Sequence, residues 1–422
     1  MKSILRGSFN RIVPCTRSVV KFSRSSSLVG LNEMNEQQLI YLDNAATSFP
    51  KPDSVSAAMD DYNRNVGAPI GRGAYRKSIE LQSSIDQCRK LAAQVLGAAR
   101  SEEIVFSFNG TDSLNTMIHG VLKAGDHVVT SDVEHNSVLR PLQTLKERWG
   151  LETTYIPANQ QGVVDAISFR EAIRDNTRLI ILNHASNVTG SIQPVNEVGE
   201  ISRKAGVLFL VDAAQTAGHL PFDISQMPVD FLACSGHKGL LGPLGTGLIY
   251  IRSELADQVA SFRQGGTGTN SEEETQPLTL PEKFESGNHN APGLIGLRSA
   301  LEYILEKGVG TLRQHEQQLT SRLIEGLQQL SGFDLPGPDR IEERVGVISL
   351  VNQVVEPQIL ASILDENFGI QTRAGLHCAP RIHRSIESRE YGGTLRFSPG
   401  PFNTLPQIEA TINAMNELAE SF

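Results

Sequence analysis

Residues 207–215 read Val-Leu-Phe-Leu-Val-Asp-Ala-Ala-Gln and are the clearest indication of the fold class. Its five consecutive apolar residues are typical of a strand that is buried on both faces, because a strand with one solvated face alternates apolar and polar residues. Strands of this kind belong to parallel sheets that helices cover on both sides. Asp212 follows at the carboxyl end of the predicted strand, where such sheets bind their ligands. The stretch therefore predicts an α/β fold with a ligand site near Asp212.

Similar apolar runs recur between Glu102 and Ile251, separated by segments with helical periodicity. The runs are residues 104–106, 128–130, 179–182, 207–211, 231–233 and 248–251. Their spacing predicts a mostly parallel sheet within a large domain, for which we take residues 39–290.

The pattern changes after Gly287 and predicts a second, smaller α+β domain over residues 291–422. Its expected elements are a long helical stretch at 294–330, strands near 345–351 and 394–397, and a helix at 357–368. A last helix opens on Thr404-Leu-Pro-Gln407, a capping-box sequence. Residues 39–70 are candidates for packing on this smaller domain.

The composition excludes several classes of protein. The 422 residues are 39% hydrophobic and 20% charged, which is ordinary for a globular chain. There are 38 basic and 47 acidic residues, and the net charge of −9 provides no global attraction for nucleic acid or anionic lipid. No apolar run approaches the ~18 residues of a membrane span, so we expect neither nucleic acid nor membrane as a partner. The four cysteines contain no CxxC pair, which indicates a reducing compartment rather than a disulfide framework or a zinc site.

The first 38 residues are set apart as an N-terminal extension. Residues 1–30 contain six basic residues, seven serines and no acid, a composition typical of an organellar transit peptide. Alternatively, translation starts at Met34 and residues 1–33 are untranslated or disordered. We expect a cytoplasmic protein in the second case and a mitochondrial or other organellar one in the first.

Two ionisable residues follow predicted buried strands. A buried carboxylate such as Asp212 is costly unless it meets a cation or hydrogen-bond donors; a protonated ring nitrogen would serve, and capping of the next loop is the alternative. Lys238 lies in Ser235-Gly-His-Lys-Gly239, where small neighbours predict a partly desolvated amine with a lowered pKa. Such an amine is a nucleophile suited to Schiff-base chemistry. A nucleotide-binding loop competes with this interpretation, although Lys238 is followed by Gly239 rather than by Ser or Thr.

The stretch Asn109-Gly110-Thr111-Asp112 opens a predicted helix directly after the run 104–106. A glycine and a hydroxyl at a helix N-terminus are suited to binding an anion, typically a phosphate. An ordinary N-cap, with Thr111 satisfying the first helix donors, is the alternative.

Cys378 lies in Thr372-Arg373-Ala-Gly-Leu-His377-Cys378-Ala-Pro380, a polar, turn-rich stretch. A cationic neighbourhood of Arg373 and a nearby imidazole would activate its thiol, and an unreactive loop thiol is the alternative. Cys88 and Cys234 fall at core positions and are expected to be inert. The spacing of His377, Cys378 and His383 is not that of a closed metal site, so no metal is expected.

With Thr111, Asp212 and Lys238 in this order, the sequence resembles the class V aminotransferase family of fold type I pyridoxal phosphate enzymes, and within it the cysteine desulfurases. The resemblance runs from Tyr41 to the C-terminus. It rests on the motifs Glu134-His135, Ser186-Asn187, Val211-Asp212-Ala-Ala-Gln215, Ser235-Gly-His-Lys238 and Arg373-Ala-Gly-Leu-His-Cys378. The short interval between Arg373 and Cys378 is similar to the second group of desulfurases.

The resemblance implies a role for each matching residue. Lys238 would bind the cofactor aldehyde and move the substrate Cα proton, and Cys378 would take the sulfur as a persulfide. Asp212 would pair with the ring nitrogen, Gln215 with the phenolic oxygen, and His135 would stack on the ring. The phosphate would be held by Thr111, Ser235 and His237, together with Gly266 and Thr267 from the second subunit of a homodimer. The substrate site would comprise Asn187, Arg373 and Arg396, the last clamping the carboxylate.

These expectations amount to a homodimeric pyridoxal phosphate enzyme that converts L-cysteine to L-alanine. Another class V enzyme, such as a selenocysteine lyase, an aminotransferase or a kynureninase-like hydrolase, is the alternative. A cofactor-carrying module and a sulfur-carrier scaffold without turnover are further competitors. The sulfur acceptor would be an iron–sulfur assembly scaffold, a carrier protein or a reductant.

Overall fold

Strand β6 (Leu208–Asp212) lies at the centre of the main sheet, and all of its residues are buried. A computed structural model describes residues 39–71, 73–269 and 272–421, and the extension predicted for residues 1–38 lies outside them. Within the described residues this sheet has seven strands in the order β2-β8-β7-β6-β5-β3-β4. Its other strands are β2 (Ile104–Ser107), β3 (His127–Ser131), β4 (Glu152–Ile156), β5 (Thr177–Asn183), β7 (Phe231–Ser235) and β8 (Gly247–Ile251).

The main sheet is mostly parallel, as the sequence predicts. Strands β4, β3, β5, β6 and β7 pair in parallel, and β8 runs antiparallel to both β7 and β2. Strand β4 was not predicted, because its Glu-Thr-Thr-Tyr-Ile sequence is polar and partly exposed. It pairs with β3 at one end of the strand order, where a strand can be left partly uncovered, whereas β2 at the other end is buried throughout.

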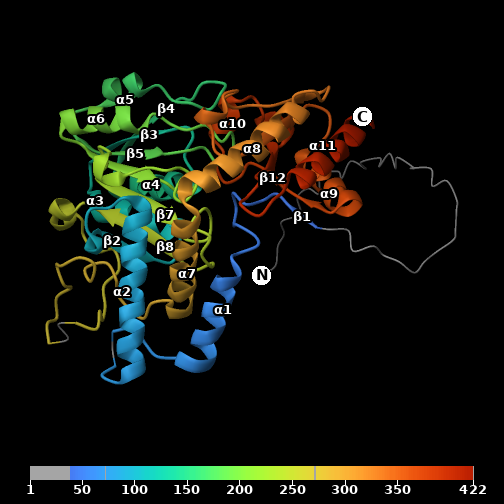
Figure 1. The fold of residues 1–422 in the computed structure, drawn as a ribbon. Helices are drawn as coiled ribbons and strands as arrows, with labels where there is room; N and C mark the ends of the chain where they lie inside the picture. The colour runs from blue at the N-terminus through green and yellow to red at the C-terminus, as the bar shows by residue number, and fades with distance from the viewer. Residues whose placement is uncertain (1–38, 72, 270–271, 422) are drawn as a thin grey trace, which may run out of the picture. The chain divides into compact units, whose positions relative to one another are not determined.

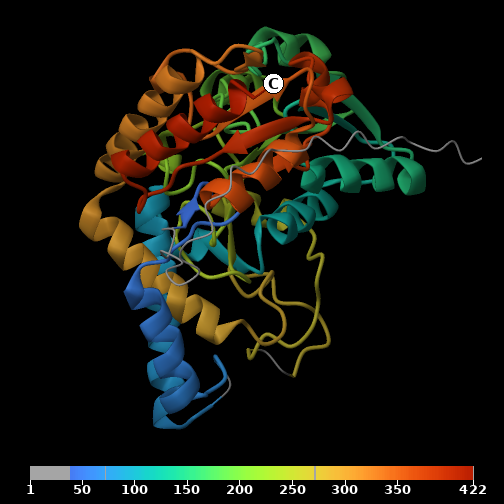
Figure 2. The same cartoon turned by 90° about the vertical axis from the view of Figure 1, so that its right-hand side faces the viewer.

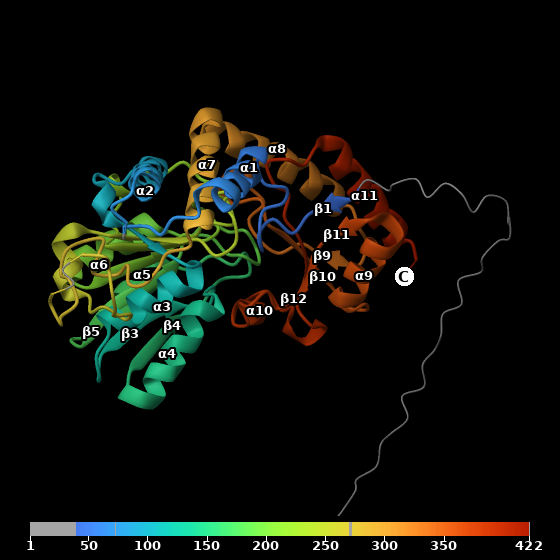
Figure 3. The same ribbon diagram turned by 90° about the horizontal axis from the view of Figure 1, so that it is seen from below.

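Helices cover both faces of this sheet. Because successive residues of a strand point to opposite faces, they belong to different hydrophobic clusters. Phe209 and Val211 pack on one face, and Leu208 and Leu210 pack on the other. The first face is covered by α2 (Arg76–Leu96), α5 (Ala166–Ala172), α6 (Val195–Ala205) and α7 (Ala291–Lys307), and the second by α3 (Gly110–Val121) and α4 (Asn136–Trp149). Figure 3 shows α2 and α7 on the side opposite α3 and α4. This arrangement confirms the predicted α/β fold class.

A smaller antiparallel sheet in the order β12-β13-β10-β9 follows in the C-terminal part. Three helices pack against it (Figures 1 and 2). The elements are β9 (Phe333–Asp334), β10 (Ile348–Asn352), β12 (Arg373–Gly375) and β13 (Thr394–Phe397), with α8 (Val309–Leu327), α9 (Pro357–Phe368) and α11 (Leu405–Ala419); α10 (Ile382–Ser385) follows β12. The division into domains at residue 290 stays a prediction.

The segment after residue 38 contributes to both regions. Strand β1 (Ile40–Tyr41) pairs in parallel with β11 (Ile370–Gln371), and Leu42 lies in the hydrophobic cluster of the small sheet. Helix α1 (Asp53–Asp61) packs beside α7, as Figure 3 shows.

The expected helical stretch at 294–330 is largely confirmed and consists of two helices. Gly308 adopts φ +79°, in the left-handed region, and separates α7 from α8. The expected helix at 357–368 and the capping box are confirmed, and Gln407 Oε1 accepts a hydrogen bond from the Thr404 N–H at 3.1 Å. Among the helices in the described part of the chain, none is long and apolar enough to cross a membrane.

Candidate active site

Polar residues end five strands of the main sheet at one edge. They are Ser107, Ser131, Asn183, Asp212 and Ser235. Parallel strands share this edge, and β2 shares it because both β2 and β7 run antiparallel to β8. A cavity of about 360 Å³, partly open to solvent, adjoins it and is lined by Gly110, Thr111, Leu114, His135, Ser137, Asn183, Asn187, Asp212, Ala214, Gln215, Ser235 and Lys238. Most of the residues predicted for the site therefore meet around one cavity.

Asp212 is the last residue of β6; it is 3% exposed, so its carboxylate is buried. The Ala214 N–H donates to its Oδ1 at 2.9 Å. Burial raises the pKa of the carboxyl group, while the Ala214 hydrogen bond and the charge of Lys238 act in the opposite direction. A cationic ring nitrogen in the cavity would stabilise the ionised form of this group.

Lys238 lies just after β7 in a tightly packed turn. A Cβ at Gly236, two residues earlier, would collide with the Thr246 hydroxyl, so the turn requires a residue without a side chain there. The Gly236 N–H donates to the Thr246 carbonyl at 2.9 Å and fixes the turn against β8. The glycines around Lys238 thus serve close packing.

The amine of Lys238 is prepared as a nucleophile. Burial is the largest of the causes that lower its pKa to about 8; the charges of Arg396 and Arg373 act in the same direction, and the charge of Asp212 acts against them. The predicted desolvation is confirmed. A larger fraction of this amine is neutral at pH 7 than of an exposed lysine, and the neutral amine is the reactive form.

His135 is the N-cap residue of α4, and its ring is fixed by the first turn of that helix. The Ser137 N–H donates to His135 Nδ1 at 3.0 Å, and the Ser137 hydroxyl lies 2.8 Å from the same atom. Burial lowers the pKa of the imidazole to about 4, and the charges of Lys238 and Arg373 add to this effect. The ring is therefore neutral at pH 7, and because Nδ1 accepts, the ring proton lies on Nε2.

The N-terminus of α3 is surrounded by hydroxyl groups. The Thr111 and Ser137 hydroxyls lie 2.7 Å apart, and the Gly110 N–H donates to Ser235 Oγ at 3.2 Å. The helix is twelve residues long and begins at Gly110 beside the cavity. Its dipole and these donors fit a phosphate group.

Cys378 lies in the loop between β12 and α10 and is exposed. His377 and Cys378 adopt φ +49° and +58°, a left-handed conformation that costs side-chain-bearing residues about 1–2 kcal/mol each. Two hydrogen bonds hold them there: the Asn136 N–H donates to the Cys378 carbonyl, and Asn187 Nδ2 donates to the His377 carbonyl, both at 2.7 Å. Since Asn187 lines the cavity, this hydrogen bond holds the loop that carries the exposed thiol beside the cavity.

Of the two cations expected near Cys378, the structure places Arg373 there, whereas the imidazole is uncharged. Arg373 Nη2 lies 3.8 Å from Cys378 Sγ. The imidazole of His377 instead faces Thr394, with Nε2 2.8 Å from its hydroxyl, and burial lowers the pKa of His377 well below its usual value. The neighbouring imidazole therefore adds no positive charge, contrary to the expectation.

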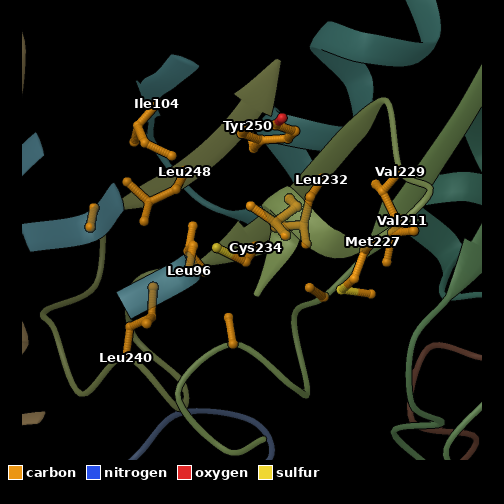
Figure 4. Close-up of a cluster of buried hydrophobic side chains, with 14 of the residues drawn as sticks. Leu96, Ile104, Val211, Met227, Val229, Leu232, Cys234, Leu240, Leu248 and Tyr250 are labelled. Carbon is orange, nitrogen blue, oxygen red and sulfur yellow. The ribbon is translucent and has the colours of Figure 1, made fainter. Parts of the chain in front are cut away.

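The other described cysteines are buried. Burial raises the pKa of Cys88 and of Cys234 to about 12. Figure 4 shows Cys234 among apolar side chains that include Leu96, Leu232 and Leu248. Both thiols stay protonated, so the expectation that they are inert is supported.

Arg396 lies on β13 and is 1% exposed. Its Nη2 donates to Asp43 Oδ1 at 2.6 Å and its Nη1 to the Asn187 carbonyl at 3.0 Å. Arg373 lies directly opposite on β12. Arg396 Nε and Asn187 Oδ1 are buried without a hydrogen-bond partner, which fits a polar ligand between them. The role of Arg396 in binding a substrate carboxylate stays a prediction.

Three predicted phosphate-binding residues do not line the cavity. Burial lowers the pKa of His237 to about 4, and its Nδ1 is buried without a hydrogen-bond partner. Thr267 lines a different cavity of about 1240 Å³, and the Gly266 carbonyl accepts from the Gly287 N–H at 2.9 Å. The contribution of Gly266 and Thr267 to a second subunit stays a prediction.

Three residues of the site were not predicted from the sequence: Asp43, Ser137 and Asn183. Asn183 was detectable, because it ends an apolar run in the same way as Asp212. Ser137 acts through local contacts with His135 and Thr111, and Asp43 is 353 residues from Arg396 in the sequence, so no local pattern reveals either.

Comparisons with known proteins agree with this geometry. The profile of the family Aminotransferase class-V matches residues 40–411. A probable cysteine desulfurase of Pyrococcus abyssi is 36% identical over 397 residues, which cover 91% of this chain and 95% of the relative. The apo structure of a cysteine desulfurase from Thermococcus onnurineus NA1 is similar with a TM-score of 0.85 and 35% identity, covering 91% of this chain and 95% of the other. The cysteine desulfurase CsdA of Escherichia coli is similar with a TM-score of 0.81 and 28% identity, with the same coverage.

Proposed function

The chain belongs to the class V aminotransferase family, and from this premise we propose that it is a cysteine desulfurase that converts L-cysteine to L-alanine and leaves the sulfur on Cys378. One observation carries the proposal. Lys238, with its pKa lowered to about 8, and the buried Asp212 line one cavity, and Asn187 of the same cavity holds the loop of an exposed cysteine.

The donor set of the cavity fits pyridoxal phosphate. Lys238 would hold its aldehyde carbon, Asp212 its ring nitrogen and Gln215 its phenolic oxygen, and the neutral ring of His135 would lie against its face. The N-terminus of α3 with Thr111 and Ser235 would hold the phosphate, with His237 nearby and Gly266 and Thr267 of the partner subunit completing the site. When bound, this cofactor withdraws electrons from the substrate Cα and makes the Cα–H bond acidic.

Residues of the chain bind and orient the substrate. Arg396, held by Asp43, provides a buried guanidinium for the carboxylate of cysteine. The unpartnered Asn187 Oδ1 can only accept, so it would take a hydrogen bond from a donor group of the substrate and not from its carboxylate. The neutral amine of Lys238 accepts the proton from Cα and later returns one.

Cys378 then accepts the sulfur. Its thiolate, with Arg373 beside it, attacks the substrate sulfur. An S–S bond forms, the Cβ–S bond breaks, and its electron pair goes to the carbon fragment, which gains a proton and becomes alanine. The products are therefore alanine and a persulfide on Cys378, in equal amounts.

The alternative reactions of class V enzymes use Lys238 but need no protein thiol. The fastened, exposed loop of Cys378 favours the desulfurase. The test is the yield of alanine and of sulfide from L-cysteine, measured together in the presence of a thiol reductant. We expect equal yields over many turnovers. Alanine without sulfide, or pyruvate as the main product, would assign another reaction.

The exposure of Cys378 also supports an acceptor that comes to the protein, such as an iron–sulfur assembly scaffold or a carrier protein. We propose a homodimer, since Thr267 and Gly266 do not reach the cavity of their own chain. A reducing compartment, such as the cytoplasm, would keep the thiol available. A mitochondrial location would require residues 1–33 to act as a transit peptide, and these lie outside the described residues.

A further inference from the structure

The loop that follows Leu42 reaches the backbone on both sides of Lys238. Three side chains of this loop, Thr47, Ser48 and Lys51, donate hydrogen bonds to the carbonyl of His237. We infer that Lys51 is a positioning residue that sets the place of the Lys238 amine. The inference rests on the proposed function, because the position of this amine matters only if it reacts.

The His237 carbonyl receives an unusual number of donors. Lys51 Nζ lies 2.9 Å away, the Ser48 N–H 3.0 Å, and the Ser48 and Thr47 hydroxyls 3.2 Å each. A carbonyl oxygen has two lone pairs, so these donors exceed what one peptide group needs for satisfaction. The additional donors indicate that the His237 peptide group is fixed in position, beyond what is needed to satisfy its carbonyl oxygen.

Ser48 extends the clamp to the next peptide. Its hydroxyl accepts from Lys51 Nζ at 2.7 Å, and its single proton is shared between the His237 carbonyl at 3.2 Å and the Lys238 carbonyl at 3.0 Å. The side chain of Lys238 leaves the backbone between these two carbonyls. A shift of either peptide therefore moves the amine relative to Asp212, and misplacement of about 1 Å is enough to slow a reaction about 100-fold.

Burying the ammonium group of Lys51 costs more free energy than a hydrogen bond that only holds the loop would require. Burial lowers its pKa to about 8, and its two hydrogen bonds go to uncharged oxygens. A neutral donor would hold the loop without the cost of burying an ammonium group. The charge also reaches the neighbouring histidine: after burial and Lys238, Lys51 is the next contributor that lowers the pKa of His237. A positive charge here therefore adds to the effect of burial, which is the main reason that the pKa of His237 is low.

The test measures how fast Lys238 of the cofactor-free protein is loaded by pyridoxal phosphate. Borohydride traps the product, and peptide mass spectrometry quantifies the modified Lys238. Lys51→Met removes the ammonium but keeps most of the stem, Lys51→Arg keeps a charged donor, and Lys204→Met is the matched control on the exposed surface of α6. Thermal unfolding of each protein reports whether the fold is retained.

We expect loading to slow about 10- to 100-fold in Lys51→Met, to recover at least in part in Lys51→Arg, and to stay unchanged in Lys204→Met. Wild-type rates in Lys51→Met, or equal losses in Lys51→Met and Lys51→Arg with normal unfolding, would overturn the inference. If Lys51→Met does not fold, Ser48→Ala decides in the same assay: slower loading supports the clamp and unchanged loading refutes it. Failure of the wild-type protein to load Lys238 would instead refute the proposed function.

Discussion

Lys238 and Cys378 are the two nucleophiles of the proposed site, and the protein prepares them in opposite ways. Lys238 is enclosed at the edge of the main sheet, where burial lowers its pKa to about 8. Cys378 is exposed on a loop in the left-handed conformation, with Arg373 as its cation. Burial activates an amine because it favours the neutral form, and the same burial silences a thiol, as the pKa of about 12 at Cys88 and Cys234 shows. A thiol that must react as an anion therefore has to be exposed, because the burial that activates the lysine would keep the thiol protonated.

The strongest test of the buried nucleophile is Lys238→Ala. We expect alanine production from cysteine to fall on the order of 10⁴-fold or more, because one residue supplies both the attachment point and the acid–base group. Amino-acid analysis of the reaction mixture measures the loss. Lys204→Ala, on the exposed face of α6, serves as the control, and substantial turnover by Lys238→Ala would contradict the assignment.

The exposed nucleophile is tested by Cys378→Ala against Cys88→Ala. Sulfide release is expected to fall on the order of 10³-fold in Cys378→Ala, the scale of a lost nucleophile, with unfolding unchanged within about 0.5 kcal/mol. Cys88→Ala should behave in the opposite way, with lower stability and near-normal sulfide release, since its thiol is buried in the core. Full sulfide release by Cys378→Ala would move the protein to one of the alternative class V reactions.

A smaller effect is expected for pH, which should change the rate at which pyridoxal phosphate reacts with the buried amine of Lys238. With a pKa of about 8, about one Lys238 amine in ten is neutral at pH 7, and the neutral fraction rises with pH. The rate at which pyridoxal phosphate loads Lys238 should therefore rise about tenfold per pH unit well below pH 8 and about fivefold between pH 7 and 8, and should level off above that. Absorption spectroscopy after rapid mixing follows the reaction. A rate that continues to rise well beyond pH 8 would show that the amine is not desolvated.

Sequence patterns predicted the fold because they report on local burial. The runs at β5, β6, β7 and β8 are apolar throughout, since central strands are buried on both faces, and they were found. Strand β4 was missed because an edge strand need not be apolar, and the break at Gly308 was missed because apolar periodicity continues through it.

The same distinction holds for the candidate site. Asp212, Lys238 and Thr111 were accessible from the sequence because Asp212 ends a strand and the other two follow strands within a few residues, and these strand ends share one edge of the sheet. The clamp of Thr47, Ser48 and Lys51 was not accessible, since it spans about 190 residues of sequence to reach the His237 and Lys238 carbonyls.

Local patterns in the sequence were enough to predict the α/β architecture, the family resemblance, the two candidate nucleophiles and the core positions of Cys88 and Cys234. The environments of the candidates became visible only in the folded chain, where the imidazole of His377 is neutral and Arg396 is held by Asp43. The physical reason is that periodicity and capping act over a few residues, whereas burial, pKa shifts and hydrogen-bond clamps depend on segments that meet only when the chain has folded.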